Sequence, residues 1–153
     1  MAKDGFGNPR LLRDAEIPRG APGDAVVGGL LAYAETLRGM GRRRKARRVL
    51  AKAVEAAREY FKDDPLECGR LLAGSLHKMA RFLSAYGKAG DALPFAAEAA
   101  DLARTEGGGL FFQALHTQAG ILRTLGRIDE AAACEAEAKQ MPCDPEDAGD
   151  FGG

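Results

Sequence analysis

The chain has 153 residues, of which 46% are hydrophobic, and its 22 basic and 22 acidic side chains give no net charge. This length suffices for one domain with a sizeable core. No run reaches the ~18 uninterrupted apolar residues of a membrane span, and residues 1–13 carry charges and glycines where a signal peptide has its apolar core. We therefore expect a cytoplasmic protein that contacts no membrane.

Glycine and proline divide the chain into a central part and two ends. Residues 1–23 are rich in both residue types and predict a flexible N-terminal arm, while residues 142–153 form an acidic, glycine-rich tail. Between them, apolar residues recur every three or four positions, and most are alanine or leucine, which favours helices over strands. The pattern predicts six helices in the domain 24–141, over residues 24–40, 43–62, 65–86, 91–105, 110–125 and 128–141.

Start and stop signals support these boundaries. Asp64 suits the N-cap of the third helix, Pro65 its first position and Glu67 the acid of a capping box. Gly41, Gly87 and Gly126 each follow a helix, where glycine adopts a left-handed backbone without a Cβ penalty.

One pattern, L-x3-A-x2-L-x3-G-x4-A-x6-A, occurs three times without a gap. Leucines spaced in this way form an apolar stripe, the alanines let two helices approach closely, and the glycine makes the turn between them. The copies are Leu30, Ala34, Leu37, Gly41, Ala46 and Ala53; Leu76, Ala80, Leu83, Gly87, Ala92 and Ala99; and Leu115, Ala119, Leu122, Gly126, Ala131 and Ala138.

The repeated motif resembles the tetratricopeptide repeat, and the resemblance covers residues 24–141. It implies an all-α fold, an α-solenoid of three antiparallel helical hairpins, that binds another protein on the concave face of its first helices. The chain departs from the family in spacing, because its turn glycines lie 46 and 39 residues apart against the usual ~34. Most aromatic and proline positions of the family signature are also unfilled, although Tyr33 and Pro65 lie near such places.

The resemblance also implies a binding face. Counting outward from the repeat leucines, the predicted partner-binding residues are Glu35, Arg38, His77, Lys78, Arg81, Gln113, His116 and Arg123. A polar, net basic face of this kind suits a protein or peptide partner that is acidic or rich in acceptors. The alternative is that these residues form ordinary solvated helix faces. The Lys/Asn clamp of chaperone-binding relatives is not reproduced, because Leu31 and Glu35 stand where it would start.

A second candidate is the basic run Arg42, Arg43, Arg44, Lys45, Arg47 and Arg48. Cations at a helix N-terminus oppose the macrodipole, so helix stability does not explain them. Three interpretations remain open: an acidic protein partner, a solvated face stabilised by Glu55 and Glu59, and phosphate binding by a nucleic-acid-associated accessory protein. The run contains no aromatic residue on which bases would stack, which disfavours nucleic acid as the partner.

The charge is unevenly distributed, since residues 1–62 carry 14 basic and 7 acidic side chains, whereas residues 63–153 carry 8 and 15. The two parts are therefore +7 and −7. Contact between unlike ends of two copies would be heterologous and would build rings or filaments. The alternative is a monomer that its charged ends keep in solution.

Catalytic patterns are missing from the sequence, so we expect a binding protein and no enzyme. Gly107-Gly108-Gly109 lacks the following Lys-Ser/Thr of a phosphate loop, and the two histidines, His77 and His116, sit on different repeats. Cys68, Cys134 and Cys143 have neither metal-ligand spacing nor a C-x-x-C pair, which predicts reduced thiols, no metal and no cofactor. The function predicted is that of an adaptor or assembly subunit.

Overall fold

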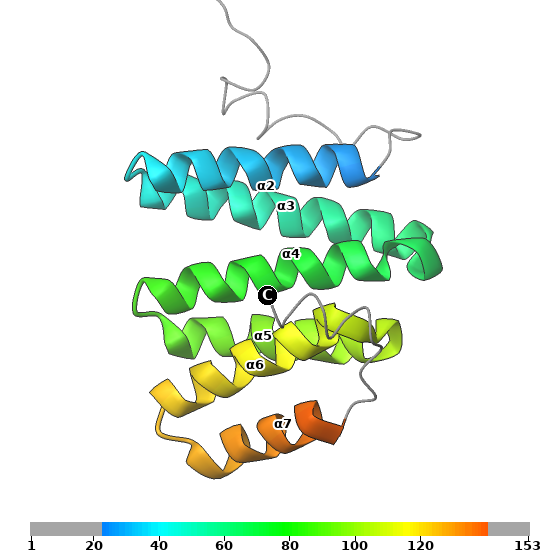
Figure 1. Ribbon diagram of the computed structural model, residues 1–153. Helices are drawn as coiled ribbons and strands as arrows, with labels where there is room; N and C mark the ends of the chain where they lie inside the picture. The colour runs from blue at the N-terminus through cyan, green and yellow to red at the C-terminus, as the bar shows by residue number, and fades with distance from the viewer. Residues whose placement is uncertain (1–22, 141–153) are drawn as a thin grey trace, which may run out of the picture. The chain divides into compact units, whose positions relative to one another are not determined.

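The computed structural model describes residues 23–140, and this part of the chain is all-helical, with six helices and no strand (Figure 1). The helices are α2 (Gly23–Gly39), α3 (Arg43–Asp63), α4 (Pro65–Ala85), α5 (Ala89–Glu106), α6 (Gly108–Thr124) and α7 (Ile128–Gln140). The prediction of an all-α helical-repeat fold is confirmed. Residues 1–22 and 141–153, which hold the predicted arm and tail, lie outside the described residues.

The chain divides into two compact units, residues 1–71 and 72–153, with the division inside α4. The N-terminal unit contains α2, α3 and the first residues of α4, and the C-terminal unit contains the rest of α4 with α5, α6 and α7. Each unit is described by itself below.

The predicted helix ends agree with the observed ones to within two residues. The largest differences are the starts of α5 and α6, at Ala89 and Gly108, each two residues earlier than expected. Ala89 is buried, so its apolar side chain favours including it in the helix. Gly107, with a φ of 73°, alone separates α5 from α6.

The three turn glycines have the conformation that the repeat predicts. Their φ angles are 80° at Gly41, 78° at Gly87 and 80° at Gly126. Two backbone bonds close each turn: the glycine N–H donates to the carbonyl three residues back, and the next N–H donates to the carbonyl five residues back. This is the Schellman motif, which satisfies carbonyls at a helix C-terminus. The second acceptors are Leu37, Leu83 and Leu122, at distances of 2.9, 2.8 and 2.8 Å.

The predicted cap of α4 is also present. The Glu67 N–H donates to the Asp64 carboxylate over 3.3 Å, and the Cys68 N–H donates to the Asp64 carbonyl over 2.9 Å. Pro65 then begins the helix. An aspartate N-cap stabilises a helix by about 1 kcal/mol relative to alanine.

In the N-terminal unit, α2 packs against α3 through the small residues of the first repeat. Ala34, Ala46 and Ala53 are buried, as is Leu37. Gly23 begins α2 where a Cβ would lie 3.1 Å from the Tyr60 ring. The burial of these three alanines agrees with the predicted close approach of the two helices, and Gly23 adds a further small residue between them.

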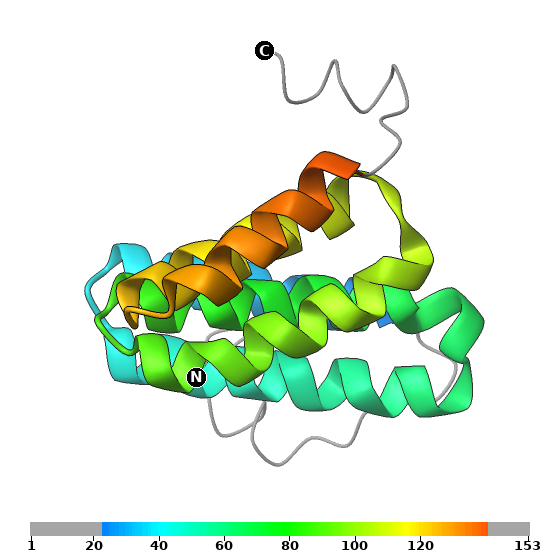
Figure 2. The same ribbon diagram turned by 90° about the horizontal axis from the view of Figure 1, so that it is seen from below.

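In the C-terminal unit, α5 packs against α6, and α6 packs against α7 (Figure 2). Ala119, Leu122 and Ala131 form a buried cluster at the α6–α7 hairpin, and the half-buried Leu93 and Cys134 pack against it. The remaining repeat positions of this unit are buried too, at Leu76, Ala80, Leu83, Ala92, Ala99, Leu115 and Ala138.

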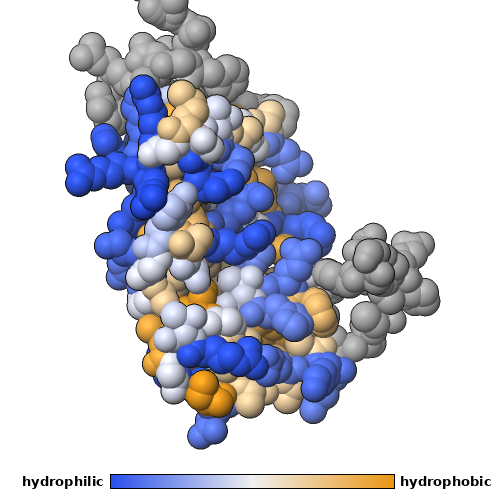
Figure 3. Space-filling model, turned by 60° about the vertical axis from the view of Figure 1, so that its left-hand side comes forward, coloured by the Kyte–Doolittle hydropathy of each residue, from blue (hydrophilic) through white to orange (hydrophobic). Residues whose placement is uncertain are grey.

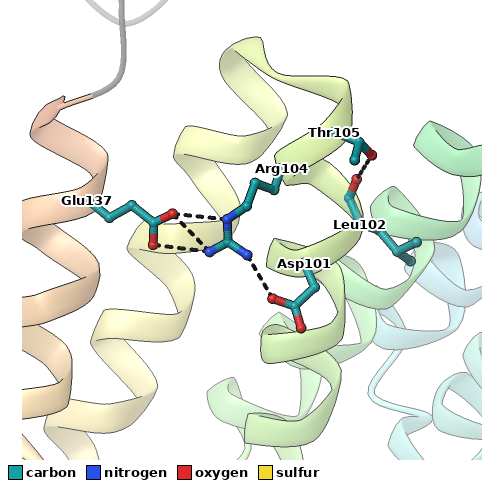
Figure 4. Close-up of polar contacts among 5 residues, drawn as sticks. All are labelled: Asp101, Leu102, Arg104, Thr105 and Glu137. Atoms are coloured by element: carbon teal, nitrogen blue, oxygen red, sulfur yellow. Dashed lines mark hydrogen bonds and ion pairs between the residues drawn. The ribbon is translucent and has the colours of Figure 1, made fainter.

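A charged contact links α5 to α7 (Figure 4). Arg104 donates to both oxygens of Glu137 over 3.0 and 3.1 Å and also to Asp101 over 3.0 Å. Its guanidinium lies 5.2 Å from the centre of the Phe111 ring. A bidentate pair with a ring contact holds α7 at a defined position more firmly than a single surface ion pair would.

Helix-interior glycines give a stability prediction. Gly28 in α2 and Gly120 in α6 are exposed, and a Cβ at either would meet no atom within 4 Å. Gly28→Ala and Gly120→Ala should each stabilise the protein by about 0.5–1 kcal/mol, because glycine loses more backbone entropy on folding. Gly126→Ala is the control and should destabilise it by about 1–2 kcal/mol, because its φ is 80°. Urea unfolding measures all three, and equal effects at Gly120 and Gly126 would contradict the prediction.

Candidate functional site on α4 and α6

A part-buried hydrogen bond connects the first helices of the second and third repeats. His77 Nε2 of α4 lies 2.7 Å from the Thr117 hydroxyl of α6. The two residues are 40 positions apart and belong to the C-terminal unit. This bond brings the polar faces of α4 and α6 together at one place.

His77 itself is buried, with only 7% of the residue exposed, so its side chain packs between the helices. Burial lowers its pKa from 6.5 to about 4, and the positive charges of Arg81 and Lys78 contribute. The imidazole is therefore neutral at pH 7 and acts as a packed polar link between helices.

Four predicted residues lie within four positions of His77 or Thr117 along the chain. Lys78 and Arg81 on α4 are exposed, as are Gln113 and His116 on α6. We call these four side chains the α4–α6 face. Lys78 and Arg81 lie one helical turn apart, as do Gln113 and His116. Together they offer two cations, an amide and an imidazole on two rigid helices.

The structure adds one aromatic side chain that the sequence reasoning missed. The Phe112 and His116 rings are in tilted contact, with their centres 4.5 Å apart and their planes at an angle of 50°. Phe112 is half-buried, so its ring fixes the position of the exposed imidazole. The i,i+4 spacing of the two residues was the available signal.

Arg123 is exposed and forms an ion pair, and its role in partner binding stays a prediction. Its guanidinium donates to the Glu135 carboxylate of α7. This hydrogen bond lowers the pKa of Glu135, which stays ionised at neutral pH. Arg123 thus joins the two helices of the third hairpin, and the cations of the α4–α6 face are Lys78 and Arg81.

The predicted residues of the first repeat belong to the N-terminal unit. Glu35 and Arg38 are exposed on α2 and form an ion pair with one another. Their charges compensate, so this part of α2 is locally neutral. A single concave face that includes all three repeats stays a prediction.

The predicted self-association would bring the acidic end of one copy, which includes α7, against the basic end of another copy. Glu130, Glu135 and Glu137 form ion pairs with Arg127, Arg123 and Arg104, respectively. Their charge is therefore compensated within the C-terminal unit, which weakens the argument for docking α7 onto a basic surface. Asp129, the fourth acid of α7, is exposed, and the acids that follow the helix in sequence, Asp144, Glu146, Asp147 and Asp150, lie outside the described residues.

The basic run lies where α3 begins. Arg42 is its N-cap residue, Lys45 is half-buried, and Arg43, Arg44, Arg47 and Arg48 are exposed, as is Arg42. The opposite face of the helix carries the buried Ala46, Val49, Leu50 and Ala53. The run is therefore the outer face of an amphipathic helix.

The chain has the fold of a solved bacterial protein. That protein is BtubC (BKLC) from P. vanneervenii, and the two structures agree with a TM-score of 0.64 at 15% sequence identity. The alignment covers 76% of this chain and 46% of BtubC, so this chain spans less than half of that protein. The likeness to BtubC concerns the fold alone. No family model and no curated protein matches the sequence.

The described residues hold no group of three or more His, Cys, Asp or Glu side chains able to bind a metal ion. Cys68 and Cys134 are both free and half-buried. Burial raises the pKa of both thiols, and nearby carboxylates raise it further. Within residues 23–140, no helix has the length and apolar character to cross a bilayer.

Proposed function

We propose that this chain is a tetratricopeptide-like interaction module, an adaptor or assembly subunit that holds a segment of another protein against the α4–α6 face. The observation that carries the proposal is the cluster of exposed donors on two helices that the His77–Thr117 bond joins. Because the two helices are already folded, binding orders only the side chains of the face and not its backbone.

The chemistry of the face indicates the kind of segment. Lys78 and Arg81 favour carboxylates, while Gln113 and His116 exchange hydrogen bonds with a peptide backbone. A segment with one or two acids and exposed backbone groups would satisfy all four residues. The tilted Phe112–His116 ring pair supplies an apolar edge against which such a segment can pack.

Binding without catalysis is part of the proposal. An activated nucleophile needs a neighbouring base or a lowered pKa, whereas the pKa of both described thiols is raised. His77 is buried and hydrogen-bonded to Thr117, and the His116 ring contacts the Phe112 ring at a tilt. The two imidazoles are thus held in packing contacts, which favours a structural role for them over proton transfer to a substrate.

Affinity purification from the source organism, with the chain as bait and mass spectrometry as the readout, tests the proposal. A protein captured by wild type should be depleted at least tenfold with Lys78→Ala/Arg81→Ala, because both cations of the face are lost. The matched control is Lys88→Ala/Lys139→Ala, which removes the same charge from exposed positions on other elements. It should capture that protein as wild type does.

Circular dichroism accompanies the purification, because both double variants should keep their helicity. If no captured protein depends on Lys78 and Arg81, the proposed binding face is wrong. Equal loss with the control would mean that net charge, and not the face, governs capture.

A further inference from the structure

We propose that the first two turns of α3 form a second docking surface, which binds an acidic polypeptide segment through Arg44, Arg47 and Arg48. The inference deepens the proposed function of an interaction module by adding a surface and its ligand chemistry. In Figure 3, strongly hydrophilic residues project from the upper part of the molecule, where Figure 1 places α2 and α3.

The fold itself does not explain these cations. The first turn of α3 contains no acid, and its N-cap residue, Arg42, makes no side-chain capping hydrogen bond. The positive end of the helix macrodipole therefore adds to the arginine charges, which destabilises the helix in isolation. Arg44, Arg47 and Arg48 are exposed, so burial of their stems against the core does not account for them.

The spacing of the arginines suits carboxylates on a regular peptide. Arg44 and Arg48 lie one turn apart, about 6 Å along the axis. Carboxylates at positions i and i+4 of a helix have the same spacing, and those at i and i+2 of an extended strand lie about 6.6 Å apart. Arginine adds bidentate geometry to each pair. A segment of about six residues with alternating acids would engage the whole surface.

The short length of the basic surface and its lack of aromatic residues favour a peptide ligand over a nucleic acid. Residues 42–48 span only about 9 Å of the helix axis, whereas duplex binding commonly engages about 6–10 phosphates. Farther along α3, Glu55 is exposed and Glu59 pairs with Lys62 over 3.3 Å. Acids accompany the bases there, so the purely basic surface ends near Arg48. The basic run also contains no aromatic residue, so it offers no base-stacking platform.

Fluorescence anisotropy with the full chain tests the inference. The probes are a labelled hexaglutamate peptide, a labelled hexalysine peptide and a labelled 20-base-pair DNA duplex, each at ~0.05 and ~0.15 M salt, where screening differs. Wild type should bind hexaglutamate, more weakly at the higher salt, and should not bind hexalysine. Arg44→Gln/Arg47→Gln/Arg48→Gln should raise the Kd for hexaglutamate at least tenfold.

One control variant tests whether binding is specific to these three arginines. Arg70→Gln/Lys88→Gln/Lys139→Gln removes the same charge from exposed positions elsewhere. It should bind hexaglutamate within about threefold of wild type. The triple α3 variant should also melt at or above the wild-type temperature, because it loses cations that oppose the macrodipole.

Four results would overturn the inference. The first is that wild type does not bind hexaglutamate, and the second is that the control variant weakens binding as much as the triple α3 variant does. The third is that the triple α3 variant keeps hexaglutamate binding while Lys78→Ala/Arg81→Ala loses it, which would assign the acidic ligand to the α4–α6 face and leave the proposed function standing. The fourth is duplex binding tighter than hexaglutamate binding at ~0.15 M salt with the same dependence on the three arginines, which would assign the surface to nucleic acid. The proposed function fails separately if Lys78→Ala/Arg81→Ala captures the native partner as well as wild type does.

Discussion

Ala119→Leu is expected to destabilise the C-terminal unit by about 1–3 kcal/mol. Ala119 is 1% exposed and belongs to the cluster with Leu122 and Ala131 at the α6–α7 hairpin. Three added carbon atoms have no cavity to enter, so α7 must move away from α6 or side chains must leave their preferred rotamers. Ala80→Leu should behave in the same way, because Ala80 is 0% exposed at the equivalent position of the second repeat.

Urea unfolding monitored by circular dichroism measures both variants. The matched control is Ala136→Leu, at an exposed position on α7, which should stay within about 0.5 kcal/mol of wild type. Unchanged unfolding midpoints for both Ala80→Leu and Ala119→Leu would mean that the alanines of the repeat are not packing contacts.

The protein should lose stability as the pH falls from about 6.5 to about 4, through protonation of His77. The unfolded histidine has a pKa of 6.5, whereas the folded pKa is about 4. The unfolded state therefore binds more protons in this window, and stability rises with pH. The difference amounts to about 2 kcal/mol between pH 7 and pH 5 and about 3 kcal/mol in full.

His77→Gln isolates this contribution, because glutamine can still hydrogen-bond to Thr117 but does not titrate. The free energy of unfolding should fall less between pH 7 and pH 5 in His77→Gln than in wild type, by about 2 kcal/mol. His116→Gln, which alters the exposed histidine, should keep the wild-type pH dependence. The same pH dependence in wild type and His77→Gln would contradict the assignment.

The helices and turns of this protein follow from local sequence signals. Asp64, Pro65 and Glu67 predicted the start of α4, and the carboxylate of Asp64 accepts the expected backbone bond. Gly41, Gly87 and Gly126 predicted left-handed turns, and all three have a φ near 80°. Such features depend on a few neighbouring residues, so the chain itself encodes them. The leucines and alanines of the threefold pattern are likewise buried, with the exception of Leu30, which is half-buried.

The surroundings of the candidate site residues, in contrast, are set by contacts with residues far away in the sequence. His77 and His116 occupy the same repeat position, yet His77 is buried against Thr117 of the next repeat while His116 is exposed beside Phe112. Arg123 has the position of a ligand-binding cation in the repeat, but it pairs with Glu135, 12 residues later. A repeat pattern predicts which face of its own helix a residue occupies. Only the packing of the neighbouring helix decides whether that side chain meets a protein partner, a carboxylate of its own chain or solvent.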